Sequence, residues 1–156
     1  MNPSNAGRRW ADVNPQEIRI VSVNSGPKCV AVVVEDEWLV RMELADALAN
    51  AGVDVFEAAG GEDALAFLEQ HDPIHVLITD IRLVGDMTGW EVAEAFRAAR
   101  PGIGVIYASA NPPLAARQVA GSMFFAKPAP MPELVETCHR FCDTAHSFAP
   151  ATRPII

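Results

Sequence analysis

Short runs of apolar residues alternate along the chain with longer stretches in which apolar residues recur at helical spacing. The runs are too short for helices and rich in β-branched or aromatic residues, as is typical of buried strands. We predict strands at residues 30–34, 53–56, 74–79, 104–108 and 123–125. The second alternates apolar and polar residues and should be half-exposed, whereas the third should be buried on both faces and end directly before Asp80.

The stretches between these runs carry stripes with the spacing of amphipathic helices. Between the first two strands the stripe consists of Val40, Leu44, Ala47, Leu48 and Ala51. Three further stripes predict helices with these inward residues: Ala64, Leu65 and Leu68; Trp90, Ala93 and Phe96; Leu134, Cys138, Phe141, Cys142 and Ala145. Between the fourth and fifth strands, Pro112-Pro113 restricts the start of a helix, so a helix there should be short or irregular.

Strands that alternate with helices predict an α/β fold, a doubly wound five-stranded parallel sheet with helices on both faces. We expect this domain to span residues 29–147. Residues 1–28 are rich in Asn, Pro, Ser and Gly and are expected to form a weakly ordered extension, with a short strand at 18–23 as its one regular piece. Residues 148–156 are expected to be a tail.

Composition and charge argue against several classes of protein, namely nucleic-acid-binding, secreted and membrane proteins. Half of the 156 residues are hydrophobic, which suits one domain with a proper core, and the net charge of −8 argues against a nucleic-acid-binding surface. The sequence has neither a secretory signal nor an apolar run near the ~20 residues of a membrane helix, so we expect a cytoplasmic protein. Three cysteines without a framework spacing are expected to be free thiols, with Cys138 and Cys142 in the core rather than binding a metal with His146.

Residues with reactive side chains follow four of the five predicted strands. Glu35 and Asp36 follow the first strand, Asp80 the third, Ser109 the fourth and Lys127 the fifth. Parallel strands present their carboxyl ends at one edge of a sheet, where ligands bind. Clustered carboxylates repel one another unless a cation joins them, and oxygen ligands of this kind suit Mg²⁺. Asp80 could then attack phosphorus as a nucleophile, with Asp36 on the metal and with Lys127 and Ser109 facing the phosphoryl oxygens.

The four motifs, in this order and spacing, resemble the receiver domain of two-component response regulators. They are Val-Val-Val-Glu35-Asp36, Ile-Thr-Asp80, Ala-Ser109-Ala and Ala-Lys127-Pro128, and the resemblance covers residues 30 to 146. It implies a strand order of 2-1-3-4-5 and a regulatory phosphoacceptor rather than an enzyme. The phosphoryl group would come from a sensor histidine kinase in a reaction that depends on Mg²⁺.

The resemblance also implies roles for single residues. Asp36, Asp80 and the backbone carbonyl of Arg82 would bind the metal, with Glu35 acting through water. Ser109 would take part in a conformational switch, and Asn111 and Arg82 would flank the path of the attacking water and set the lifetime of the phosphoryl group. The peptide bond between Lys127 and Pro128 is commonly cis in this family.

Four features of the sequence, two residues and two segment lengths, depart from the common pattern of the family. Val84 replaces a proline, the loop that ends at Gly89 is one residue longer, and Phe124 occupies the position of the aromatic switch residue, where tyrosine is usual. Without a hydroxyl, Phe124 has no polar group to hold it outward. The interval from Ser109 to Lys127 is also about one helical turn shorter. We therefore expect the surface around the fourth helix to recognise partners in an unusual way.

Two other functions are alternatives to that of a receiver domain. An aspartyl-phosphate phosphatase would carry a second aspartate two residues after Asp80, where this chain has Arg82. A phosphorylation-independent interaction module would not need the four motifs intact. We expect a single-domain regulator, since the chain has no room for an output domain, that acts through a downstream protein or a phosphorelay partner. The sequence leaves open the identity of these partners and whether phosphorylation drives formation of a homodimer.

Overall fold

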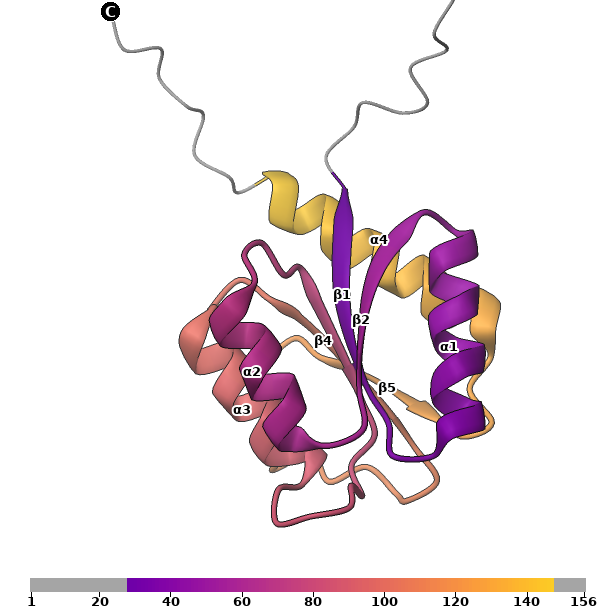
Figure 1. The fold of residues 1–156 in the computed structure, drawn as a ribbon, viewed down its shortest axis with the longest axis vertical. Coiled ribbons are helices and arrows are strands. Elements are labelled where there is room, and N and C mark those ends of the chain that lie inside the picture. The colour runs from indigo at the N-terminus through magenta and orange to yellow at the C-terminus, as the bar shows by residue number, and fades with distance from the viewer. Residues whose placement is uncertain (1–27, 148–156) are drawn as a thin grey trace, which may run out of the picture.

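The computed structural model describes residues 28–147, which form five strands and four helices in strict alternation up to β4 (Figure 1). The strands are β1 (Cys29–Val34), β2 (Val53–Ala58), β3 (Val76–Thr79), β4 (Gly104–Ser109) and β5 (Met123–Ala126). The helices are α1 (Trp38–Asn50), α2 (Gly61–Gln70), α3 (Gly89–Ala99) and α4 (Met131–Ser147). The predicted extension at 1–28, its strand at 18–23 and the tail at 148–156 lie, except for residue 28, outside the described residues.

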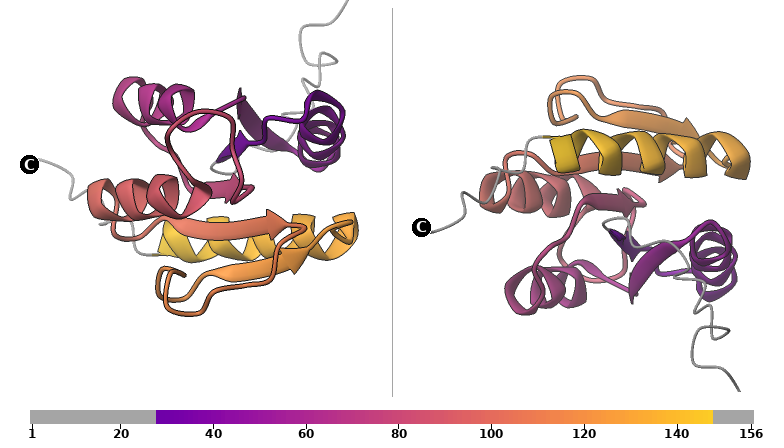
Figure 2. Two further views of the ribbon diagram at one scale, coloured as in Figure 1. Left: turned by 90° about the horizontal axis from the view of Figure 1, so that it is seen from below. Right: turned by 90° about the horizontal axis from the view of Figure 1, so that it is seen from above.

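All five strands are parallel and lie in the order β2-β1-β3-β4-β5, as the resemblance implied. The ladder of β3 begins at Val76, two residues later than the apolar run predicts, although His75 already donates its backbone N–H to the carbonyl of Val30. Helices α2 and α3 cover one face of the sheet, and α1 and α4 cover the other (Figure 2). The predicted α/β fold with helices on both faces is therefore confirmed.

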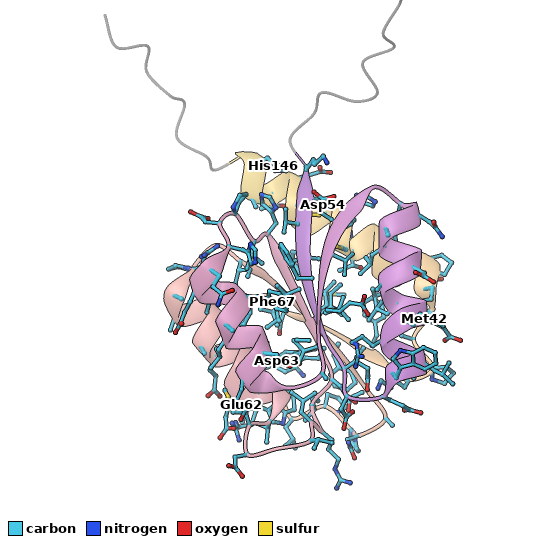
Figure 3. The ribbon with its side chains drawn as sticks, viewed as in Figure 1. Met42, Asp54, Glu62, Asp63, Phe67 and His146 are labelled. Atoms are coloured by element: carbon cyan, nitrogen blue, oxygen red, sulfur yellow. A yellow bond between two sulfur atoms is a disulfide. The ribbon has the colours of Figure 1, made fainter. Side chains whose placement is uncertain are left out.

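Alternating side chains of the strands divide the core into two clusters, one on each face of the sheet. Val32, Leu77 and Val105 pack with α2 and α3, whereas Val33 and Ile78 pack with α1 and α4. The sheet-facing side of α2 also carries Phe67 (Figure 3), which is half-buried against the first cluster. Because β1, β3 and β4 are covered on both faces, their sequences are continuous apolar runs.

The connection between β4 and β5 contains turns and no regular helix. Its turn bonds run from Arg117 and Gln118 to the carbonyl of Leu114. The loop packs on its neighbours through polar contacts instead: Arg97 of α3 donates to the carbonyl of Ala120 at 2.7 Å. The prediction that a helix here would be short or irregular is confirmed, because this segment contains only turns. The helix labelled α4 is therefore the last of the chain's predicted helices, the one expected to begin near Pro132.

The prediction that all three cysteines are free thiols is wrong. Cys29 at the start of β1 and Cys142 in α4 form a disulfide across 113 residues of chain, and only Cys138 is free. Sequence spacing carried no sign of this pair, because the two residues meet only after the sheet has placed β1 beside α4. Cys138 and Cys142 both lie in the core, as predicted.

Candidate functional site

Strand register brings the predicted reactive residues to one edge of the sheet. Val34 of β1 pairs with Thr79 of β3, so Glu35 and Asp80, the next residues of each chain segment, are neighbours. On the other side Ser109 pairs with Ala126, and the N–H of Lys127 donates to the carbonyl of Ser109 at 3.0 Å. The reactive residues at the carboxyl ends of four of the five strands therefore lie at this edge of the sheet.

Three carboxylates form the centre of the site. Oxygen atoms of Glu35, Asp36 and Asp80 lie within 4.8 Å of one another. Glu35 is buried, with 3% of its surface exposed, while Asp36 and Asp80 are half-buried. Oxygen ligands at this spacing, two of them open to solvent, fit a Mg²⁺ ion that keeps several waters.

Lys127 joins two of these carboxylates. Its ammonium group donates to Oε2 of Glu35 at 2.5 Å and to Oδ2 of Asp80 at 2.9 Å. The three side chains are 19%, 4% and 11% exposed, so solvent screens the contacts only weakly. The peptide bond from Lys127 to Pro128 is cis, as the resemblance implied.

Burial and the hydrogen-bonded partners have opposite effects on the pKa values of Glu35 and Lys127. Burial raises the pKa of Glu35 above its ordinary value, although the hydrogen bonds from Lys127 and from the backbone N–H of Glu37 oppose the rise. Burial alone would lower the pKa of Lys127, but its bonds to Glu35 and Asp80 outweigh that effect and the pKa is raised. Lys127 therefore keeps its positive charge at neutral pH.

The backbone orients the carboxylate of Asp80. The backbone N–H of Asp80 continues the sheet by donating to the carbonyl of Val34 at 2.9 Å. The N–H of Ile81 donates to Oδ1 of Asp80 at 2.6 Å. The hydroxyl of Thr79 donates to the carbonyl of Asp80 at 2.7 Å. With Oδ1 on a backbone amide and Oδ2 on Lys127, the carboxylate is held at the open end of the strand.

The other predicted residues lie at different depths. Ser109 is fully buried, and its hydroxyl oxygen accepts from the backbone N–H of Asn111 at 3.2 Å and lies 3.5 Å from the side-chain nitrogen of Asn111. Arg82 is exposed on the loop after β3. Phe124 is half-buried on β5 and packs against the core cluster beneath α2 and α3.

Two supporting residues were not predicted. Arg41 of α1 donates to the backbone carbonyl of Glu35 at 2.8 Å and thereby fixes the turn that carries the carboxylates. Tyr107, the only tyrosine of the chain, is fully buried against Trp90, with ring centroids 4.8 Å apart. Its hydroxyl accepts from the N–H of Val119 at 3.2 Å and so anchors the loop between β4 and β5. A tyrosine inside an apolar run was the available signal, because a buried hydroxyl needs a partner.

An apolar pocket of about 480 Å³ opens beside the carboxylates. Its polar side includes Glu35, Asp80 and Lys127. Its apolar side lies between α1 and α4 and includes Val40 and Met131. The site therefore joins a charged edge to a hollow that an apolar side chain of a partner could enter.

Gly89 sets the path of the loop that follows Asp80. A Cβ atom at this position would lie 1.8 Å from the carbonyl oxygen of Asp80, and the N–H of Gly89 donates to the carbonyl of Ile81 at 2.7 Å.

We expect Gly89→Ala to lower the free energy of unfolding by about 3 kcal/mol, because the backbone must move to admit the methyl group. Chemical denaturation measures this. Gly102→Ala is the matched control, since nothing lies within 4 Å of its added Cβ; equal losses in both variants would contradict the close approach.

Comparisons with known proteins agree with this geometry. A family model described as the response regulator receiver domain matches residues 31–139. A response regulator receiver protein from Sinorhizobium medicae is 24% identical with a TM-score of 0.72, covering 76% of this chain and 97% of its own. A CheY-like receiver domain from Methanospirillum hungatei is also 24% identical, with a TM-score of 0.70 and coverage of 79% and 100%. The receiver domain of the hybrid histidine kinase CckA is 27% identical, with a TM-score of 0.62 and coverage of 72% and 98%. No curated protein matches the chain.

Proposed function

The chain belongs to the response regulator receiver domain family, and from this membership we propose that it accepts a phosphoryl group on Asp80 from a sensor histidine kinase. The observation that carries the proposal is the carboxylate of Asp80, oriented by Ile81 and Lys127 inside an acidic cluster. The phosphorylated form would signal through contacts with a downstream protein or pass the group along a phosphorelay.

The transfer places each side chain in a chemical role. An oxygen of Asp80 attacks the phosphorus of a phosphohistidine whose other ring nitrogen is protonated; a P–O bond forms, and the P–N bond breaks as neutral imidazole leaves. Lys127 exchanges its contact with Asp80 for one with a phosphoryl oxygen, which keeps its charge paired. The hydroxyl of Ser109 accepts from Asn111, so its own proton remains to be donated to the phosphoryl group.

Mg²⁺ fits the same cluster. Asp36 and Asp80 would hold the ion, with the backbone carbonyl of Arg82 as a third ligand and Glu35 acting through water. When bound, the ion would neutralise negative charge on the phosphoryl oxygens. Glu35, which is paired with Lys127, is the residue of the cluster least able to reach the ion directly.

A partner surface adjoins this site. Three apolar residues at the start of α1 are exposed, namely Trp38 (62%), Leu39 (56%) and Met42 (37%). Met42 lies on the side of α1 away from the sheet (Figure 3). Exposed apolar residues next to a reactive group commonly mark a protein contact. They support docking of the histidine-bearing partner over Asp80.

Phosphorylation with a small donor tests the function. The purified protein, Mg²⁺ and acetyl phosphate should give a phosphoryl adduct detected by intact mass, and both a chelator and Asp80→Asn should abolish it. Asp54→Asn is the matched control, because Asp54 is exposed on β2, far from the site, and forms an exposed ion pair with Lys28 at 3.7 Å. An adduct that persists in Asp80→Asn, or none from either acetyl phosphate or a phosphorylated kinase domain, would refute the proposal.

The lifetime of the adduct should depend on Arg82 and Asn111. Arg82 is exposed two residues after Asp80, and Asn111 contacts Ser109 at the other side of the site. Membership of the receiver family implies that residues at these two positions flank the path of the attacking water. We expect Arg82→Ala and Asn111→Ala each to change the rate of adduct decay several-fold, as changed positioning of a reacting water does. Decay followed by intact mass measures the rates; values within about twofold of the parent protein in both variants would contradict this role.

A further inference from the structure

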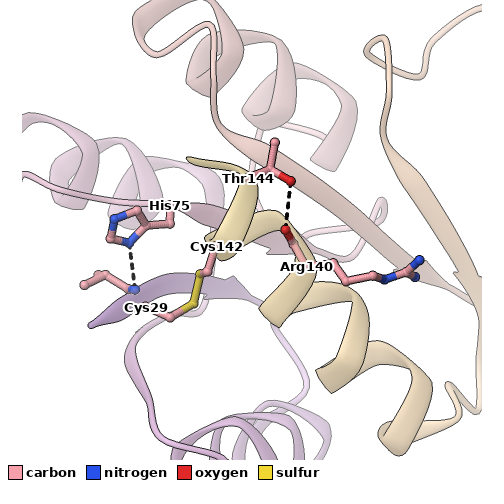
Figure 4. The surroundings of a disulfide bond; sticks show 6 residues. Cys29, His75, Arg140, Cys142 and Thr144 are labelled. Carbon is pink, nitrogen blue, oxygen red and sulfur yellow. Dashed lines mark hydrogen bonds between the residues drawn. A yellow bond between two sulfur atoms is a disulfide. The ribbon is translucent and has the colours of Figure 1, made fainter. Parts of the chain in front are cut away.

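All three cysteines of the chain meet at one point in the core, at the end of the sheet opposite the carboxylates. Cys29 is the first residue of β1, and Cys138 and Cys142 are one turn apart on α4. Their sulfur atoms lie within 4.8 Å of one another, and Cys29 and Cys142 are bonded (Figure 4). The residues are 7%, 0% and 2% exposed, respectively.

The surroundings suit both the bonded and the unbonded form of the pair. The cluster around these sulfurs is apolar and includes Leu48, Val53 and Val76. Neutral thiols pack in such a core as small hydrophobic groups, and a disulfide is also uncharged. Reduction therefore puts no charge into the core, so the fold can hold either state.

The three sulfurs differ in access. Cys29 is the least buried, and the residue before it, Lys28, is exposed. Cys138 is completely buried, and burial raises its pKa to about 12, so it remains a thiol at neutral pH and is a poor nucleophile. Of the three residues, Cys29 therefore lies nearest to solvent, whereas Cys138 lies deepest and stays out of the reaction.

We propose that Cys29 and Cys142 form a reversible thiol–disulfide site that exchanges with small disulfides and thiols of the glutathione class. In oxidation, the thiolate of Cys29 attacks a glutathione disulfide, forming a mixed disulfide and releasing one glutathione thiolate. The thiol of Cys142 then loses its proton as its sulfur attacks the sulfur of Cys29, and the second glutathione thiolate leaves and takes up a proton. Two protein thiols are oxidised to one disulfide while one glutathione disulfide is reduced to two thiols.

The site controls how firmly α4 is attached to β1. At the carboxyl end of β1, Glu35 pairs with Lys127, four residues before α4 begins. At the amino end, the disulfide fixes Cys142 in the last third of the same helix. Oxidation thus adds a covalent attachment, and reduction leaves α4 held to β1 by packing and by the nearby ion pair.

Thiol counting in folded protein tests the proposal. After equilibration with glutathione disulfide, quenching in acid and unfolding, one of the three cysteines should react with a maleimide reagent; after equilibration with excess glutathione, all three should. Peptide mapping should find Cys29 linked to Cys142 in the oxidised sample. Cys138→Ala should keep the reversible link, and Cys29→Ala should lose it. Circular dichroism should show the same secondary structure in both states.

Two results would overturn the proposal. Three reactive thiols in every glutathione buffer would show that the pair does not form in solution. A link that glutathione removes only after denaturant is added would show a permanent structural bond rather than an exchange site.

Discussion

Replacing Lys127 by methionine should lower the free energy of unfolding by about 3 kcal/mol at pH 7 in the absence of divalent cations. Methionine keeps most of the length of the side chain but removes the charge that joins Glu35 and Asp80. Glu35 is then a buried carboxylate without its cation, and loss of one partner of a buried pair costs several kcal/mol. Urea denaturation followed by circular dichroism measures the change.

The pH dependence of this loss identifies its cause. Without Lys127 the pKa of Glu35, already raised by burial, has no ammonium group to oppose the rise. A carboxyl whose pKa is higher in the folded than in the unfolded state destabilises the fold once the pH exceeds the unfolded value. The penalty should therefore shrink as the pH falls from 7 toward 4. Added Mg²⁺ should also raise the melting temperature of Lys127→Met more than that of the parent protein.

Lys28→Met is the matched control for this substitution. Lys28 also forms an ion pair, with Asp54 at 3.7 Å, but the two side chains are 74% and 53% exposed. Exposed pairs contribute little, so this variant should stay within about 0.5 kcal/mol of the parent. A loss in Lys127→Met no larger than in Lys28→Met would show that the buried carboxylates do not need the lysine.

Reduction of the Cys29–Cys142 bond should lower the free energy of unfolding by about 4 kcal/mol. The bond closes 113 residues of chain, nearly the whole described domain, and cross-links of this span restrict the unfolded chain most strongly. For a domain of this size the loss corresponds to a fall of about 15 °C in melting temperature. Calorimetry with and without a reductant measures it.

Two cysteine variants control for side effects of the reductant. Cys29→Ala should melt at the temperature of the reduced parent, apart from the small cost of the lost sulfur, and should not respond to reductant. Cys138→Ala should still respond, because Cys138 is not part of the bond. A parent protein whose melting temperature does not change on reduction would contradict the estimate.

The fold was predictable from the sequence because its signals are local and repeated. The apolar runs of β1, β3 and β4 are continuous because these strands are covered on both faces. The same runs end at Glu35, Asp80 and Ser109, so parallel order alone placed the predicted groups at one edge. Pro112-Pro113 and the short interval before Lys127 likewise indicated that a helix before β5 would be short or irregular.

The contacts that the sequence did not reveal are those made between distant side chains. The disulfide joins residues whose surroundings resemble ordinary core positions, and nothing near Cys29 in the sequence indicates Cys142. Lys127 forms an ion pair with Glu35 as well as with Asp80. This second contact depends on the position of the turn after β1, where Arg41 donates to the backbone carbonyl of Glu35. Such details follow from packing geometry, which periodicity does not encode.

The pair formed by Tyr107 and Trp90 gives the protein an internal optical reporter. With ring centroids 4.8 Å apart, light absorbed by the tyrosine is transferred to the indole, and Trp90 is shielded from solvent quenchers that reach the exposed Trp38. Since Tyr107 also holds the loop between β4 and β5, movement of that loop alters the surroundings of the indole. The emission of Trp90 therefore reports the state of the loop in the unlabelled protein.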